Sequence, residues 1–322
     1  MDILTILEKQ AEQVEVFSLE SEKTTVEYEA NQLKTCTVTS TKGTAARVIH
    51  KGRLGFSAST DRMAMDKLAA NVLESAAYGD QTSFSFSDPK PAISVKTYDK
   101  TIAELPIDRL VEIGKDILDL ILPDDPIVSC NLSLSRGLAS TNIRNQKGLD
   151  VSFQTSPLML SIKLDRMEEN DVLIRYEQFG TNVWDKDYLA FACRLAEQLK
   201  LARKLTTIKP GRIPVLFSPA GAQALILPLC EALNGKEVYK GTSPIKGKLE
   251  EKLFDEKITL LDDGTVDGCF GSTPYDDEGI PHRRNVLVEK GVLKSFIYDL
   301  KTAAQAETES TGNAVRSLFT QP

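Results

Sequence analysis

The chain has 322 residues, of which 41% are hydrophobic and 26% are charged, with a formal net charge of −7. This length predicts about two domains, each with enough apolar residues for a real core. Because nucleic-acid phosphates are bound by clustered lysine and arginine, the negative charge argues against a nucleic-acid partner.

No apolar run approaches the length of a membrane span, and the chain opens with an amphipathic segment rather than a signal peptide. Its five cysteines are widely spaced, and none forms a C-x-x-C pair. Reduced, buried thiols in the cytoplasm are typical of that pattern. We therefore expect a cytoplasmic protein without a membrane partner.

Residues 1–79 are predicted as an N-terminal α+β domain. Apolar residues at helical spacing in residues 3–14 predict a short helix, and a period of two in residues 14–57 predicts a meander of antiparallel strands. A second helix is expected after Asp61, whose side chain suits a helix cap. Residues 80–104 are rich in Ser, Thr, Asp, Lys and Pro, which predicts a linker.

Residues 105–208 repeat this pattern and are predicted as a middle α+β domain. A helix is expected from Pro106, a proline at the first helical position, to Pro123. A further helix is expected over about residues 184–205. Between the two helices, strands with one apolar and one polar face predict an antiparallel sheet with one face on a core: residues 128–134, 149–153 and 158–164.

Residues 209–322 are predicted as a mixed, strand-rich C-terminal domain. The apolar residues 213–217 predict a short strand, and Ser218 with Pro219 opens a helix. Pro228 lies inside that helix, where it removes a backbone donor and is expected to kink it. The fold class of the whole chain is therefore predicted as α+β.

The most informative stretch begins with Asp276-Asp277-Glu278-Gly279, which predicts a sharp, exposed turn. A β-hairpin follows, with Lys290-Gly291 as its two-residue turn and residues 292–298 as its return strand. Asp299 occupies the N-cap position of another helix. The polar residues 310–316 then predict a loop.

The order of these motifs resembles the C-terminal domain of the TldD/PmbA family, whose members are called modulators of DNA gyrase and metalloprotease subunits. The remainder of the chain fits the layout of that family, so the resemblance covers nearly the whole sequence. The family normally continues well past the position of Pro322, so this domain is expected to be truncated, with an exposed apolar edge. The resemblance depends on Asp262-Asp263-Gly264, Asp276-Asp277-Glu278-Gly279, Glu289-Lys290-Gly291-Val292-Leu293-Lys294 and Ser310-Thr311-Gly312-Asn313.

The resemblance raises the question of zinc-dependent peptide hydrolysis, which needs neutral imidazoles and a glutamate base. The catalytic TldD branch carries an H-E-x-x-x-H motif on the helix after the short strand. That motif places its histidines at Leu227 and Ala232 and its glutamate at Pro228. The only histidines, His50 and His282, lie far apart in the sequence. The chain therefore resembles the non-catalytic PmbA/TldE branch, with no catalytic, cofactor-binding or metal-binding residue and with zinc expected in a TldD-type partner.

A small set of polar residues remains as candidates for contact with a substrate or partner. The adjacent acids suit a cation or a peptide amine, but they cannot all face one point, which favours a charge-paired turn held by Arg283 or Arg284. The histidine of this set is interpreted first as a solvated loop residue. The candidates are Asp276, Asp277, Glu278, His282, Asn313 and Arg316.

The alternating strands allow a function that needs no catalytic residue, because an open strand edge can bind an extended peptide by β-augmentation. The resemblance therefore favours a non-catalytic subunit of a TldD/TldE metalloprotease complex that handles unfolded peptides. The alternative is a homodimeric peptide-binding or regulatory protein with no hydrolytic role. A direct link to gyrase has little support, since no segment has the character of a nucleic-acid surface.

Overall fold

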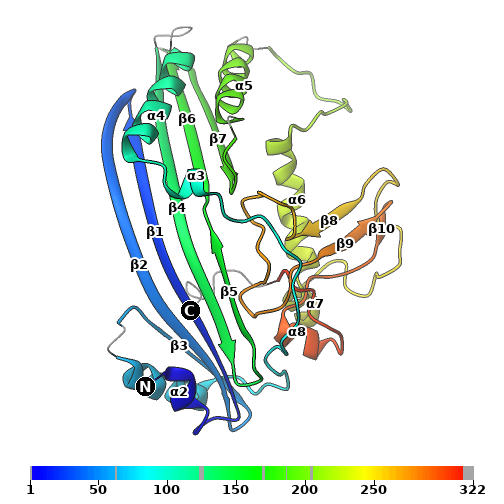
Figure 1. Cartoon of the computed structure of the whole chain (residues 1–322). Helices are drawn as coiled ribbons and strands as arrows, with labels where there is room; N and C mark the ends of the chain where they lie inside the picture. Colours follow the sequence, from blue (N-terminus) through cyan, green and yellow to red (C-terminus); the bar gives the residue numbers. More distant parts are fainter. Residues whose placement is uncertain are drawn as a thin grey trace.

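The computed structural model describes residues 2–61, 64–122, 127–168, 171–185, 187–203 and 206–314. It combines helices with antiparallel sheets, which confirms the predicted α+β fold class. A long curved sheet forms the body of the molecule, and a smaller unit of helices and short strands lies beside it (Figure 1). In the described part of the chain, no helix is both long and apolar enough to cross a membrane.

Seven strands form the large sheet, in the order β3-β2-β1-β4-β6-β7, with β5 also paired to β4. In the centre, β1 pairs with β2 on one side and β4 on the other, so that Phe17 lies between Ala45 and Ile143. The strands on either side of the predicted linker therefore share one sheet instead of building two. The strands are β1 (Gln13–Glu29), β2 (Gln32–His50), β3 (Arg53–Ser59), β4 (Val128–Asn145), β5 (Asp150–Thr155), β6 (Leu158–Glu168) and β7 (Asp171–Thr181).

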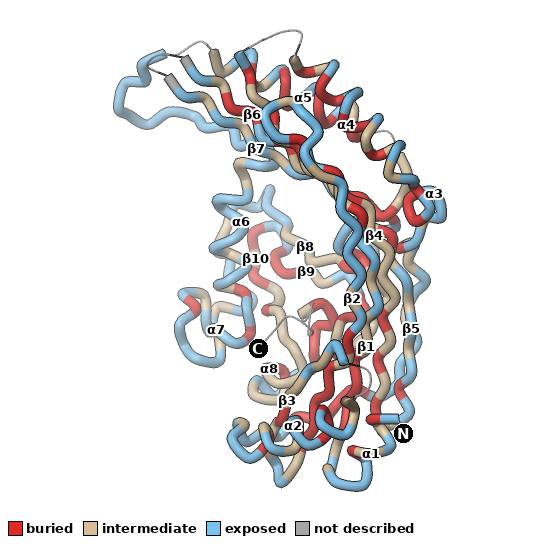
Figure 2. Tube along the Cα trace, turned by 90° about the vertical axis from the view of Figure 1, so that its left-hand side faces the viewer, coloured by how far each residue is buried: buried red, intermediate tan, exposed pale blue. Residues whose placement is uncertain are grey.

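Helices cover one face of this sheet in two groups. The first group packs on Val14 and Val16 near the start of β1, and the second packs on Val26 near its end. These three valines have the same parity, and alternate side chains of a strand point to the same face, so both groups pack on one face of β1. The helices are α1 (Ile3–Leu7) and α2 (Met65–Tyr78) in the first group, and α4 (Ile107–Ile121) and α5 (Asp187–Ala202) in the second, with the short α3 (Lys100–Ala103) before α4. Figure 2 shows α4 and α5 at one end of the sheet and α1 and α2 at the other.

The C-terminal unit lies on the opposite face. Glu15 has the other parity in β1, and it pairs with Arg47, which also reaches Glu278 of the C-terminal unit. At the far edge of the sheet, the ring of Phe270 packs on Gly180 of β7. The unit consists of α6 (Pro219–Leu233), α7 (Gly235–Lys240), α8 (Leu300–Gln305) and a small sheet of β8 (Leu260–Asp263), β9 (Arg284–Glu289) and β10 (Val292–Leu293).

Among the described strands of the large sheet, two long edges have open backbone. β3 pairs only with residues 44–50 of β2, so residues 32–43 have a neighbour on one side alone. β7 pairs only with β6, apart from an isolated bridge between Thr181 and Cys269. These edges expose rows of N–H and C=O groups that another extended chain can pair with.

Several local predictions are confirmed. Lys290 and Gly291 both have positive φ and join β9 to β10, as a tight hairpin turn requires. Asp299 caps α8 and forms a capping box with Thr302. Ser218 caps α6, because its side chain accepts a hydrogen bond from the amide of Gly221.

Other local predictions are wrong. Residues 213–217 form no strand, and the Leu216 side chain is 98% exposed. The return strand of the hairpin is limited to Val292–Leu293. The helix expected after Asp61 is present as α2, but its N-cap is Ala64 and not Asp61. Of the cysteines, expected to be buried, only Cys130 is buried, whereas Cys36, Cys193, Cys230 and Cys269 are exposed.

Candidate functional site

The acidic turn is buried, not exposed as the sequence predicts. Asp276 is 1% exposed and Glu278 is 2% exposed. The Asp276 carboxylate holds the turn closed, because its Oδ1 accepts hydrogen bonds from the amides of Glu278 and Ile280, both at 3.0 Å. Gly279 completes the turn with a φ of +69°, which only glycine adopts without strain.

Arg47 of β2 is the counter-ion that makes this burial possible. Its Nη1 lies 2.9 Å from Glu278 Oε1, and its Nε lies 2.9 Å from Glu15 Oε1. The second oxygen of Glu278 accepts a hydrogen bond from the Leu300 amide at 2.8 Å, at the start of α8. Arg47 thus joins β1, β2, the acidic turn and α8 at one point, which we call the Arg47 node: Glu15, Arg47, Asp276 and Glu278.

Arg283, one of the two predicted partners of the acidic turn, binds the loop after α8. The Nε atom of Arg283 donates to the carbonyl of Thr311 at 2.8 Å, and its guanidinium also donates to the carbonyl of Ser310. Glu278 pairs with Arg47 and not with Arg283 or Arg284. Arg283 therefore fixes the loop after α8, and the counter-ion of Glu278 is Arg47.

The Arg47 node contains more acids than bases, and burial raises their pKa values. Desolvation raises the pKa of Glu15 to about 7, although Arg47 opposes the shift. Burial also raises the pKa of Glu278, and that of Asp276 is raised well above its usual range by burial and by the neighbouring Glu278. Burial alone would lower the pKa of Arg47, but Glu15 and Glu278 raise it overall. A proton is therefore held more readily here than at an exposed carboxyl.

His282 is also buried, at 2% exposed, so its interpretation as a solvated loop residue is wrong. Its Nδ1 lies 3.2 Å from Thr273 Oγ1 and 3.3 Å from the carbonyl oxygen of Gly264. Gly264 is required for this approach, since a Cβ there would lie 2.5 Å from the imidazole. The ring packs between the end of β8 and the acidic turn.

Asn313 joins the last described loop to the small sheet. Its Nδ2 donates to the carbonyls of Asp262 at 3.1 Å and Arg283 at 2.8 Å, and its Oδ1 accepts from the Arg283 amide at 3.2 Å. Asp277 is half-buried beside the other two acids of the turn. The fold thus gathers five of the six candidates in one region, while Arg316 lies outside the described residues.

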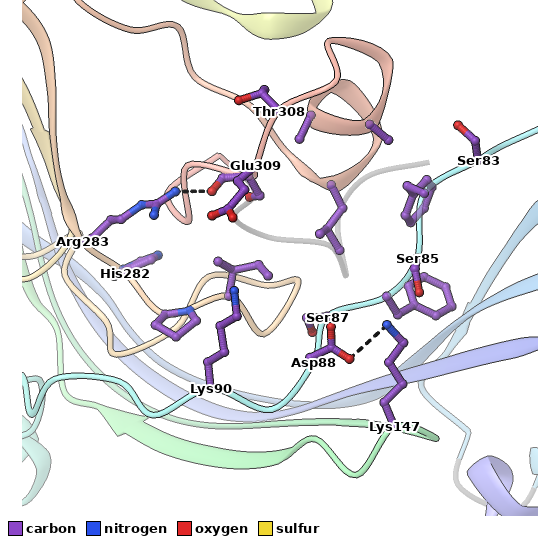
Figure 3. A pocket seen from close by; sticks show the side chains of 18 of the residues that line it. Ser83, Ser85, Ser87, Asp88, Lys90, Lys147, His282, Arg283, Thr308 and Glu309 are labelled. Atoms are coloured by element: carbon purple, nitrogen blue, oxygen red, sulfur yellow. Dashed lines mark hydrogen bonds and ion pairs between the residues drawn. The ribbon is translucent and has the colours of Figure 1, made fainter.

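A cavity of about 610 Å³ opens beside the Arg47 node, between the predicted linker, the end of the acidic turn and α8 (Figure 3). Phe86 anchors the linker wall because its ring lies under the Arg47 guanidinium, 5.2 Å from ring centroid to Cζ. Ser87 Oγ donates to the Glu278 carbonyl at 2.8 Å. Sequence reasoning missed this wall, although Ser-Phe-Ser-Phe-Ser at residues 83–87 has the period of two that indicates an extended segment with one buried face.

The positions of the H-E-x-x-x-H motif do not fit a zinc ion. Leu227, Pro228 and Ala232 on α6 have side chains without nitrogen, oxygen or sulfur, so none of them can donate a lone pair to a metal. Within the described residues, no group of three or more His, Cys, Asp or Glu side chains is arranged to hold a metal ion. A step through zinc therefore cannot be assigned to these side chains.

Two family models match the chain, and both describe one family. Residues 14–76 match PmbA/TldA metallopeptidase domain 1, and residues 210–322 match the PmbA/TldA metallopeptidase C-terminal domain. The protein belongs to the TldD/PmbA family. Members of this family are also called modulators of DNA gyrase.

Two relatives and one solved structure are similar to this TldD/PmbA protein over most of its length. An uncharacterized protein of Methanocaldococcus jannaschii is 28% identical over 99% of this chain and 75% of its own length. A metalloprotease of the same organism is 25% identical over 87% of this chain, which spans 64% of that relative. The crystal structure of TldE from Thermococcus kodakarensis has the same fold, with a TM-score of 0.88 and 24% identity over 99% of this chain and 74% of that chain.

Proposed function

We propose that this protein is a PmbA/TldE-type subunit of a cytoplasmic metalloprotease complex that handles unfolded peptides. In this proposal it assists peptide hydrolysis, and a TldD-type partner supplies the zinc. Relatives of this chain are called metalloproteases. The family membership supports a place in proteolysis, and the side chains of α6 support the non-catalytic role.

The observation that carries the proposal is the chemistry of α6. A zinc peptidase holds its metal with imidazole nitrogens and leaves one position open for water. Here the corresponding side chains are Leu227, Pro228 and Ala232, which offer neither a ligand nor a general base. His282 lies outside α6, between Thr273 and Gly264.

Exposed apolar side chains support a partner surface on this part of the molecule. Leu216 and Phe217 precede α6 and are exposed, and Leu225 and Leu227 are exposed on the helix itself. A helix that is apolar on all sides is normally covered by protein. We assign this surface to the TldD-type subunit.

Open strand edges support the peptide-handling part of the proposal. Residues 32–43 of β2 and the outer side of β7 present backbone groups without a neighbouring described strand. β-Augmentation binds peptide backbone and tolerates many sequences. That property suits unfolded substrates.

The test is reconstitution with a TldD-type partner, followed by metal analysis and a peptide-digestion assay. We expect zinc and cleavage in the mixture, and neither in this chain alone. A partner whose H-E-x-x-x-H glutamate is replaced by glutamine is the control, and its mixture should bind zinc without cleaving. Zinc-dependent cleavage by the purified chain alone, or a mixture that restores no cleavage, would contradict the proposal.

The second candidate is a homodimeric peptide-binding or regulatory protein with no hydrolytic role. It is favoured by the same open edges of β2 and β7, which need no enzyme partner to bind peptide. Light scattering distinguishes the two candidates. A stable homodimer that does not bind a TldD-type protein favours the second candidate, and a mixed complex favours the first candidate.

A further inference from the structure

The cavity beside the Arg47 node has an apolar floor and a polar wall. Ile280, Leu300 and Ala304 contribute apolar lining, which we call the floor. The linker residues 83–88 contribute the wall, on which Figure 3 labels Ser83, Ser85, Ser87 and Asp88. Its volume of about 610 Å³ lies within the range of known small-ligand and peptide pockets. The floor suits an apolar side chain, and the wall adds polar recognition.

The wall presents an open backbone edge. Phe84 and Phe86 are buried, and the Phe86 amide donates to Gln13 Oε1 at 2.9 Å on the inner side. Ser83 and Ser85 alternate with them, and within the described chain their amides and carbonyls make no hydrogen bond. In an extended segment, the N–H and C=O groups of alternate residues point to the same side. The unused groups of Ser83 and Ser85 can therefore pair with an added strand.

Lys90 supplies a positive charge without a counter-ion. Its side chain points into the cavity in Figure 3, and it forms no ion pair with any described residue. The other lysine of the lining, Lys147, already pairs with Asp88 at 3.2 Å. Pro89 and Pro91 flank Lys90, and Tyr275 Oη donates to its carbonyl at 3.1 Å, so its backbone is held in place before any ligand arrives.

We propose that this cavity binds the C-terminal end of an extended peptide, with the peptide backbone along Ser83–Ser85, its last apolar side chain on the floor and its terminal carboxylate at Lys90. The ligand class rests on the proposed peptide-handling function. The site itself is separate from the motif positions on α6 and from the open edges of the large sheet. It gives the subunit a preference for free chain ends over internal segments.

The test compares two labelled probes by fluorescence anisotropy: a short unstructured peptide ending in leucine, and the same peptide with a C-terminal amide. We expect the free acid to bind more tightly. Lys90→Gln should weaken the free acid about three- to fivefold, the range for a solvent-exposed ion pair, and leave the amide unchanged. Lys67→Gln, on the exposed face of α2, is the matched control and should bind both probes as the wild type does.

A second pair of variants tests the backbone edge. Ser85→Pro removes the amide at an extended position and should weaken both probes about tenfold. Ser85→Ala keeps the amide but loses the hydroxyl, whose bond to Gln13 Oε1 measures 2.9 Å, and should bind like the wild type. Weakening by Ser85→Ala equal to that by Ser85→Pro would contradict backbone pairing.

The inference is overturned if neither probe binds, if acid and amide bind equally, or if Lys90→Gln behaves like Lys67→Gln. Cleavage by the mixture with a TldD-type partner is measured on the same samples. Cleavage without binding of the free acid overturns this inference alone. Binding of the free acid without cleavage supports it, and contradicts only the proposed protease role.

Discussion

The acidic turn and the apolar residues 213–217 with α6 belong to the same C-terminal unit, yet the polar turn is buried and the apolar side chains are exposed. Asp276 and Glu278 are almost completely buried, whereas Leu216 and Leu227 are 98% and 63% exposed. Each acid has hydrogen-bond partners from the turn, from Arg47 or from α8. No described element covers residues 213–217.

This contrast shows that burial in this unit follows the supply of partners and not hydropathy. A buried charge is tolerated when donors and a counter-ion surround it. An apolar side chain stays exposed when nothing packs on it, whatever its preference. Substitutions at the buried acids or their partners should therefore cost more stability than substitutions of the exposed apolar residues, and four substitutions test this comparison.

The largest effect is expected from Arg47→Met. It leaves Glu15 and Glu278 buried without their counter-ion and should lower the free energy of unfolding by about 3–5 kcal/mol, measured by urea denaturation. Arg144→Met is the control. Arg144 pairs with Asp2 near the surface, and the loss should stay below about 1 kcal/mol. Equal losses for the two variants would refute the role of the Arg47 node.

The next effect is a pH dependence. The folded-state pKa of Glu15 is about 7, against 4.5 for the ordinary side chain, so folding favours its protonated form. The contribution of Glu15 to the free energy of unfolding is complete below about pH 4.5 and is lost as the pH rises to about 7. The total change is roughly 3 kcal/mol. Relative to Glu15→Gln, the wild type should therefore lose stability over this interval, measured by thermal unfolding in a pH series.

Glu12→Gln provides a control of opposite sign. Hydrogen bonds from its own amide and from that of Lys51 lower the pKa of Glu12, so its contribution is present above the ordinary pKa and is lost as the pH falls. The two variants should deviate from the wild type in opposite directions. The same direction for both would contradict the raised pKa of Glu15.

A smaller effect is expected from Gly279→Ala. The new Cβ would lie 2.3 Å from Leu149 Cδ2, and φ is +69°, so strain and overpacking together should cost about 2–3 kcal/mol. Gly52→Ala has a nearly equal φ of +71° and open space around it, and it should cost about 1 kcal/mol. Urea midpoints that do not differ would show that the turn is not packed against the sheet.

The smallest effect is expected from Leu227→Ala. Its side chain is already in water, so the free energy of unfolding should change by less than about 0.5 kcal/mol. Leu233→Ala, on the same helix but fully buried, should cost about 2–5 kcal/mol. If Leu227 contacts the TldD-type subunit, Leu227→Ala should weaken assembly in sedimentation experiments without this loss of stability.

The sequence predicts those features of the fold that depend on neighbouring residues. The Lys290-Gly291 turn needs two residues with positive φ, and the Asp299 cap needs only Thr302 three positions later. All the residues that form such a pattern lie within a few positions of one another in the sequence. The fold class follows in the same way from the periods of the strands and helices.

The Arg47 node is invisible to such patterns, because its members are distant in the sequence. Arg47 and Glu278 are separated by 231 positions, and sequence reasoning paired the turn with the nearby Arg283 or Arg284 instead. For a related reason, the composition of residues 80–104 does not reveal that Phe84 and Phe86 are buried. Residues 213–217 show the opposite case. Their apolar run predicts a strand, but a strand forms only where a neighbouring strand can pair with it.

The central place of β1 in the sheet also sets the order in which its neighbours can pair with it during synthesis. As the polypeptide leaves the ribosome, β1 and β2 can pair at once. The other edge of β1 has no partner until β4 is synthesised, which places Ile143 opposite Phe17. Such distant pairing is slow, and the waiting hairpin is exposed to unwanted association. Nascent chains should therefore need the protection of chaperones until β4 is made.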